Sequence, residues 1–204
     1  MKCIIIGAVP LDMENIKLED QDLVIASDGG YINCQKLNIT PHLLVGDFDS
    51  LDTLPTDVDM IKYPTEKADT DTLLCLKEGM KRGYSDFILY GCVGERIEHT
   101  IANIQLLAWG IKRSINVELI TNNIYMKLLK AGDTVDLKAS FKGYISLFSY
   151  SKNSTITIMG LKYPVKRKHF TNYYPLGIDN EVTDTDAFIK IHQGQVLLII
   201  NKKM

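Results

Sequence analysis

The chain lacks the features that mark secreted, membrane-bound and nucleic-acid-binding proteins. Its four cysteines form no C-x-x-C pair and no spacing typical of a zinc site, so we expect reduced thiols in a cytoplasmic protein. No apolar stretch approaches membrane-spanning length, and Pro10 and Asp12 interrupt the short apolar run near the start, unlike a signal peptide. A formal net charge of -2 gives no general attraction to nucleic acid or anionic lipid. We therefore expect neither nucleic acid nor a membrane as a partner.

The first part of the chain, residues 1–125, alternates short β-rich runs with helical patterns. Apolar faces at helical spacing predict helices over 30–37, 70–81 and 98–109. The β-rich runs predict strands over 2–6, 23–26, 42–45, 60–63, 87–90 and 117–121. This alternation predicts an α/β domain with a mostly parallel sheet that helices cover on its faces.

The second part, residues 126–204, has short β-like runs and no strong helical periodicity. The expected strands are 134–137, 144–150 and 155–159, followed by a hairpin in which 188–192 turns through Gln193-Gly194 into 195–200. We place the boundary between Asn123 and Gly132. The pattern predicts a smaller all-β domain that resembles a sandwich.

Two aspartates, Asp47 and Asp49, follow an apolar run that ends at Gly46. In open α/β sheets, ligands bind outside the carboxyl ends of the strands. Two carboxylates held close together repel one another unless a cation or a proton intervenes, and carboxylate oxygens suit Mg²⁺. The pair predicts a metal site, although an Asx-turn is the simpler structural alternative.

A second polar segment, Asp28-Gly29-Gly30, lies between an expected strand and an expected helix. The glycines allow the backbone to approach a ligand closely, and a helix N-terminus presents free N–H groups to an anion. Asp is also a favoured helix N-cap, so a purely structural role stays open.

A third segment opens the expected helix at residue 70. Thr70 or Asp69 suits the N-cap position, and an early acidic residue suits the helix dipole. At the same sheet edge as the Asp47 pair, Asp71 would add a third carboxylate and Lys67 a positive charge for phosphate.

The fourth segment begins with Gly91 and Gly94 after another expected strand. Arg96 offers a planar, multi-donor cation, and His99 falls in the first helical turn. A glycine loop followed by these side chains favours nucleotide binding over a structural role. Each of the four segments has a bland explanation alone, but their joint placement at one sheet edge predicts an active site.

These segments resemble the bacterial type of thiamine pyrophosphokinase. The resemblance rests on Ala26-Ser27-Asp28-Gly29-Gly30, Gly46-Asp47-Phe48-Asp49-Ser50, Thr70-Asp71 and Gly91-x-x-Gly94-x-Arg96-x-Glu98-His99-Thr100-x-Ala102-Asn103, in the family's order and approximate spacing. Gly177-Ile178-Asp179-Asn180-Glu181 resembles the family's C-terminal segment more loosely. This chain departs from the family at Ala68 and Asp179, where an aspartate and a small hydroxyl residue are usual.

The resemblance implies transfer of a pyrophosphoryl group from ATP to the hydroxyl of thiamine, giving thiamine diphosphate and AMP, in a homodimer. It implies that residues 1–125 form the catalytic, ATP-binding domain and residues 126–204 the domain for thiamine binding and dimerisation. The implied Mg²⁺ ligands are Asp47, Asp49 and Asp71, which with Asp28 form the catalytic set. The implied ATP contacts are Gly29, Gly30, Lys67, Thr70, Arg96 and His99, and the implied thiamine contacts are Asp179 and Asn180.

Two other functions stay open on the sequence alone. A haloacid-dehalogenase-like phosphatase would use Asp47 as a nucleophile and form an aspartyl-phosphate. A non-catalytic sensor would bind thiamine or a nucleotide in the same pocket without forming AMP.

Overall fold

A computed structural model describes residues 1–12, 16, 18–94 and 96–203 of the chain. It divides into two compact units, which we call unit 1 (Met1–Asn122) and unit 2 (Asn123–Met204). The helices of the described residues include none that is long and apolar enough to cross a membrane. Each unit is described by itself.

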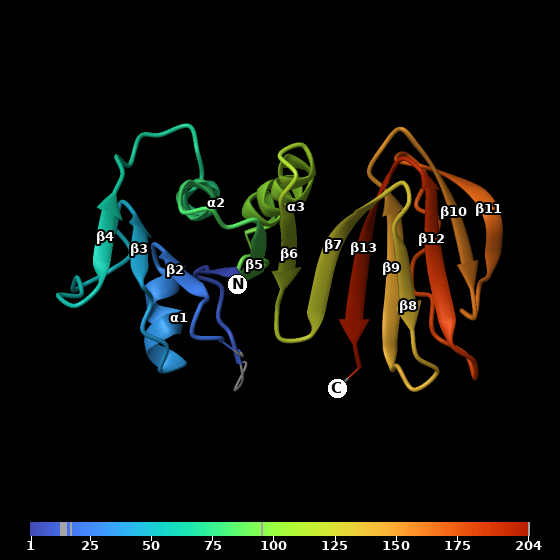
Figure 1. Ribbon diagram of the computed structural model, residues 1–204, viewed down its shortest axis with the longest axis horizontal. Coiled ribbons are helices and arrows are strands. Elements are labelled where there is room, and N and C mark those ends of the chain that lie inside the picture. Colours follow the sequence, from blue (N-terminus) through green and yellow to red (C-terminus); the bar gives the residue numbers. More distant parts are fainter. Residues whose placement is uncertain (13–15, 17, 95, 204) are drawn as a thin grey trace. The chain divides into compact units, whose positions relative to one another are not determined.

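Unit 1 is a parallel sheet with helices on both faces, as the sequence predicted (Figure 1). Its strands lie in the order β4-β3-β2-β1-β5-β6. The strands are β1 (Cys3–Ile6), β2 (Leu23–Ser27), β3 (Leu43–Gly46), β4 (Asp59–Lys62), β5 (Asp86–Tyr90) and β6 (Asn116–Ile120). The helices are α1 (Gly30–Lys36), α2 (Asp71–Lys81) and α3 (Ile97–Ile111).

Burial on both faces explains why the central strands are continuously apolar. All four residues of β1 are buried, and successive side chains point to opposite faces of a strand. Ile4 and Ile6 pack in a cluster with Cys34 of α1. Cys3, one position earlier, lies against Gly79 of α2 on the opposite face. The sheet is therefore the shared core of two helical layers.

The strand order reverses beside β1, and this reversal positions the site. From β1 the chain adds β2, β3 and β4 on one side, and then β5 and β6 on the other. In such sheets the loops after the two central strands diverge and leave a crevice at the carboxyl ends. The loops after β1 and β5 therefore border the crevice in which a ligand is expected.

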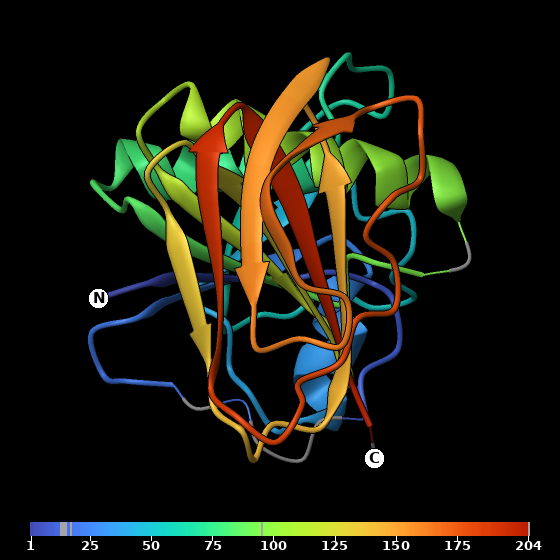
Figure 2. The same ribbon diagram turned by 90° about the vertical axis from the view of Figure 1, so that its right-hand side faces the viewer.

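Unit 2 is a sandwich of antiparallel strands, which confirms the predicted all-β fold (Figures 1 and 2). One layer contains β7, β13 and β9 in that order, and the other has the order β11-β10-β12-β8. The strands are β7 (Ile124–Lys130), β8 (Thr134–Leu137), β9 (Gly143–Ser149), β10 (Asn153–Met159), β11 (Val165–Thr171), β12 (Ala187–Gln193) and β13 (Gln195–Lys202). Apolar side chains from both layers form one buried cluster between them.

The predicted hairpin of 188–192 with 195–200 is wrong. These segments form β12 and β13, which belong to different layers: β12 pairs with β10 and β8, and β13 pairs with β7 and β9. Between them, Gly194 has a φ of 79°, a conformation that favours glycine and lets the chain turn sharply. Both strands bury apolar side chains in the common cluster, so long-range packing decides their partners. The expected set of strands also omitted β7 and β11.

A buried carboxylate fastens α2 to the segment after β4. The side chain of Glu78 is only 6% exposed, and it accepts hydrogen bonds from the Tyr63 hydroxyl at 3.0 Å and the Lys81 ammonium at 2.6 Å. Arg82 donates to its second oxygen at 3.1 Å. Burial raises the pKa of Glu78, but the bonds from Lys81, Tyr63 and Arg82 outweigh burial and hold the pKa below its ordinary value of 4.5.

We predict that Glu78→Gln lowers the free energy of unfolding by about 1–3 kcal/mol at neutral pH, because three donors lose a charged acceptor. A depressed carboxyl pKa stabilises the fold above the ordinary value of 4.5 and ceases to do so as the pH falls through the folded-state value. The difference between the two proteins should therefore shrink in acid. Urea denaturation between pH 3 and pH 7 measures it, with the exposed Glu66→Gln as control; a constant difference across this range would contradict the prediction.

Candidate functional site

A cavity of about 670 Å³ opens at the carboxyl ends of the strands of unit 1. It is lined by the segments that follow β1, β2, β3 and β5 and by the starts of α2 and α3. The lining residues are Gly7, Ala8, Val9, Pro10, Ser27, Asp28, Gly29, Asp47, Asp49, Ser50, Thr70, Asp71, Thr72, Gly91, Cys92, Gly94, Arg96, His99, Thr100 and Asn103. The four polar segments expected at this edge thus contribute to a single cavity.

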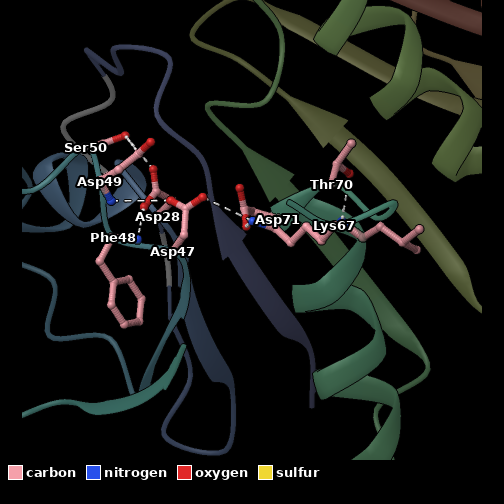
Figure 3. A network of polar contacts seen from close by, with 9 residues as sticks. Asp28, Asp47, Phe48, Asp49, Ser50, Lys67, Thr70 and Asp71 are labelled. Carbon is pink, nitrogen blue, oxygen red and sulfur yellow. Dashed lines mark hydrogen bonds and ion pairs between the residues drawn. The ribbon is translucent and has the colours of Figure 1, made fainter. Parts of the chain in front are cut away.

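Three carboxylates converge on one wall of the cavity (Figure 3). One side-chain oxygen from each of Asp28, Asp47 and Asp49 lies within 4.8 Å of the other two. The backbone N–H of Asp49 donates to Asp47 Oδ1 at 3.3 Å, which holds the two members of the pair together. Such a set of oxygens is suited to a hard divalent cation.

Asp28 occupies a strained position between two loops. Its φ of 46° lies in the left-handed region that side chains rarely adopt. Asp28 Oδ1 accepts the N–H of Phe48 at 3.0 Å, and Asp28 Oδ2 accepts the hydroxyl of Ser50 at 2.5 Å. Phe48 also has a positive φ, of 69°, and its side chain is buried in the core beside α1. The loops after β2 and β3 are therefore joined through this carboxylate.

Asp71 is connected to the three carboxylates through a lysine. Lys67 Nζ lies 3.4 Å from Asp47 Oδ2 and 3.1 Å from Asp71 Oδ1. Within the described part of the chain, Asp71 Oδ1 is buried and accepts no hydrogen bond, since the approach of the ammonium has ion-pair distance without hydrogen-bond geometry. The geometry thus groups Asp28, rather than the expected Asp71, with Asp47 and Asp49.

The charges of this network shift the pKa values of its members. Burial raises the pKa of Asp47, but the hydrogen bond from the Asp49 amide and the charge of Lys67 lower it by more. The net result is a pKa below the ordinary value. Burial raises the pKa of Asp71, and the nearby carboxylates of Asp28 and Asp47 add to the rise, so that it exceeds the ordinary value despite Lys67. The raised pKa of Asp71 thus shows that a further negative charge is unfavourable beside these carboxylates.

The other expected ligand contacts in unit 1 have distinct positions. Gly29 and Thr70 line the cavity, and Thr70 also caps α2 by accepting the N–H of Leu73 at 3.3 Å. Gly30 does not line it: a Cβ there would lie 1.9 Å from the carbonyl oxygen of Ile6, so glycine permits the close packing of α1 on β1. Lys67 contributes through its ion pairs, although it is not among the cavity's lining residues in the described part of the chain.

Arg96 and His99 also line the cavity, at the start of α3. Both side chains are exposed, and Arg96 donates from Nε to Glu98 at 2.8 Å. An exposed guanidinium with a flexible partner can turn toward an anionic ligand. Asp69, the possible N-cap, instead pairs with Lys77 of α2.

The two expected thiamine contacts belong to unit 2. Asn180 is buried, and its side-chain amide bonds to the backbone: Oδ1 accepts from Tyr163 and Glu181, and Nδ2 donates to the Tyr163 carbonyl. These bonds fix the local loop. Asp179 is exposed, has a φ of 54°, and donates its N–H to Ser146.

Sequence reasoning assigned no role to the two asparagines that hold the glycine loops of the cavity. The side-chain amide of buried Asn33, on α1, donates to the carbonyls of Gly7 and Val9 at 2.7 and 2.8 Å. Asn103, on α3, donates to the carbonyl of Cys92 at 2.7 Å. The position of Gly7 directly after the central strand was the available signal, because that loop must border the crevice.

Comparisons with known proteins agree over most of the chain. Residues 15–119 match the family described as "Thiamin pyrophosphokinase, catalytic domain", and residues 134–196 match "Thiamin pyrophosphokinase, vitamin B1 binding domain". The thiamine pyrophosphokinase of Bacillus subtilis is 28% identical over 192 residues, which cover 89% of this chain and 88% of that protein.

Solved structures show the same fold. The crystal structure of thiamine pyrophosphokinase from Bacillus subtilis has a TM-score of 0.86 at 24% identity, with 100% of both chains covered. The thiamin pyrophosphokinase from Candida albicans has a TM-score of 0.77 at 17% identity, covering 99% of this chain and 90% of that one. At these identities the structures support the architecture described above.

We predict that Asn33→Ala lowers the free energy of unfolding by about 2–3 kcal/mol, because two buried carbonyls lose their donor. The loop of 7–10 should also loosen, so ATP should stabilise this variant against heat less than it stabilises the unaltered protein. Urea denaturation and thermal shifts with Mg-ATP measure both effects. Gln35→Ala, an exposed change on the same helix, is the control. Equal stability and equal thermal shifts in the two variants would refute the role of Asn33 in holding the loop.

Proposed function

The chain belongs to the thiamin pyrophosphokinase family, and we infer from this that it transfers the pyrophosphoryl group of ATP to the hydroxyl of thiamine, giving thiamine diphosphate and AMP. Accordingly, it is a thiamine diphosphokinase and a transferase whose substrates are ATP and thiamine. The observation that carries the proposal for the site is the convergence of Asp28, Asp47 and Asp49 in a cavity at the carboxyl ends of parallel strands.

The carboxylates of the cavity are suited to Mg²⁺. ATP carries several negative charges, and the cluster of Asp28, Asp47 and Asp49 would repel it without a cation between them. The buried Oδ1 of Asp71, which accepts no hydrogen bond among the described residues, leaves a further oxygen beside this group. When bound, Mg²⁺ would neutralise the phosphates and orient them for in-line attack. We propose that Asp28, Asp47 and Asp49 hold the ion, with Asp71 beside them.

The remaining residues of the site have separate proposed roles. Lys67, between Asp47 and Asp71, supplies a positive charge for the transferred phosphates. Arg96 and His99 contact ATP from the start of α3, where Arg96 can neutralise the charge of the departing AMP. Gly29 and Thr70 present the backbone and a hydroxyl beside the phosphates, while Gly30 acts through the packing of α1.

Asp71 is the carboxylate proposed to meet the thiamine hydroxyl. Both oxygens of Asp28 already accept hydrogen bonds within the protein, from Phe48 and Ser50. Asp71 lines the cavity, and its buried Oδ1 pairs with Lys67 at 3.1 Å without accepting a hydrogen bond among the described residues. We propose that the carboxylate of Asp71 accepts a hydrogen bond from the attacking hydroxyl and orients it.

Residues 1–125 are proposed as the catalytic, ATP-binding domain and residues 126–204 as the domain for thiamine binding and dimerisation. In the second domain, Asp179 offers an exposed carboxylate near the buried, loop-fixing Asn180. The homodimer is proposed from family membership alone. A cytoplasmic location is proposed because all four cysteines are buried, free thiols.

We predict that the purified protein with Mg-ATP and thiamine forms thiamine diphosphate and AMP in equal amounts, with no ADP. Chromatography of the nucleotides and of the thiamine esters measures this, and a reaction in EDTA is the control. ADP as the product would contradict pyrophosphoryl transfer. Ligand binding without AMP would indicate a sensor, and an acid-stable adduct on Asp47 would indicate a phosphatase, which the comparisons do not favour.

We predict that Asp71→Asn lowers kcat about a hundredfold or more but changes the affinity for ATP far less, because the lost interaction belongs to the attacking hydroxyl. Steady-state kinetics with varied ATP separate the two effects. Asp69→Asn is the matched control, since Asp69 precedes Asp71 by two residues and pairs with Lys77. Unchanged turnover in Asp71→Asn would remove this residue from the mechanism.

A further inference from the structure

We propose that Ser50 is a positioning residue that holds Asp28 and Asp49 at the spacing needed to share a divalent cation. This inference rests on the proposed function, in which these aspartates are metal ligands. It concerns a hydroxyl that contacts the carboxylates and is not itself assigned to the cation or the substrates.

The hydroxyl of Ser50 lies between two carboxylates from different loops (Figure 3). Ser50 Oγ is 2.5 Å from Asp28 Oδ2 and 3.2 Å from Asp49 Oδ1. A serine hydroxyl has one hydrogen to donate, so the two carboxylates share a single donor. The short distance to Asp28 marks the stronger of the two interactions.

This bridge is needed because the two aspartates have few other constraints in common. Asp49 is tied to Asp47 through its backbone N–H, whereas Asp28 belongs to the loop after β2. Asp28 is held in a left-handed conformation, which is unfavourable for a side chain and persists only where surrounding contacts enforce it. Among the described residues, the Phe48 amide and the Ser50 hydroxyl donate hydrogen bonds to its oxygens.

Electrostatics oppose the arrangement that Ser50 maintains. Carboxylates with oxygens within 4.8 Å of one another repel, and a hydroxyl donor between two of them offsets part of this repulsion. Without the hydroxyl, Asp28 and Asp49 would separate, and a cation would have to bring them together again on binding. Removal of a partner that orients metal ligands typically costs about 10–100-fold in metal affinity.

The test is Mn²⁺ binding in the absence of nucleotide and thiamine, measured by electron paramagnetic resonance. Ser50→Ala is expected to bind Mn²⁺ about tenfold more weakly, and Ser50→Thr, which keeps the hydroxyl, is expected to bind it as the unaltered protein does. In turnover assays, Ser50→Ala should need about tenfold more Mg²⁺ for half-maximal rate. Ser85→Ala, an exposed serine change in the same unit, is the control.

A second pair of variants keeps the test decisive if Ser50→Ala does not fold. Thr and Val have nearly the same shape, so Ser50→Thr and Ser50→Val differ only in the hydroxyl at this position. Weak Mn²⁺ binding in Ser50→Val alone supports the proposal, whereas equal binding by these two variants overturns it.

The same experiment separates this inference from the proposed metal site. If Asp47→Asn loses Mn²⁺ and Ser50→Ala keeps the full affinity, the metal site stands and the role of Ser50 is refuted. If the unaltered protein binds no Mn²⁺, both the metal site and the role of Ser50 are refuted.

Discussion

Mutual repulsion of carboxylates is the constraint around which the edge of unit 1 is arranged. Asp28, Asp47 and Asp49 bring three oxygens within 4.8 Å of one another. Each lies beside a group that donates a hydrogen bond or carries a positive charge: a backbone amide, a serine hydroxyl or the ammonium of Lys67. These donors offset the repulsion only in part, so the group remains suited to a divalent cation. The chemistry proposed for the chain follows from this residual charge.

The sheet topology determines where this charge is useful. Because the strand order reverses beside β1, the loops after β1 and β5 border a cavity instead of packing on one another. Buried Asn33 and Asn103 hold those loops by their backbone carbonyls, so the cavity walls are fixed by the helices behind them. A polyphosphate in the cavity would meet the guanidinium of Arg96 at the start of α3 and carboxylates at the ends of β2 and β3.

Local patterns predicted unit 1 better than unit 2, for a physical reason. A strand buried on both faces is a continuous apolar run, and the paired aspartates stand out where such a run ends. In unit 2, β11 is an edge strand in which the consecutive charges of Lys166, Arg167 and Lys168 obscure the strand pattern. The partners of β12 and β13 depend on contacts between distant segments, which the short turn between them does not reveal. Asn33 was missed because it acts by donating hydrogen bonds to backbone carbonyls. Every residue has a backbone carbonyl, so the types of the partner residues do not reveal this role.

The change of layer between β12 and β13 has a consequence for biosynthesis. β13 lies between β7 and β9, so the last strand of unit 2 in chain order joins the two earlier strands of its layer. While a ribosome is still adding residues 195–202, β7 and β9 lack their common neighbour and expose unpaired edges. Such edges favour association with other chains, and late closure of distant strands is slow. Unit 2 can therefore complete this layer only after β13 has been made.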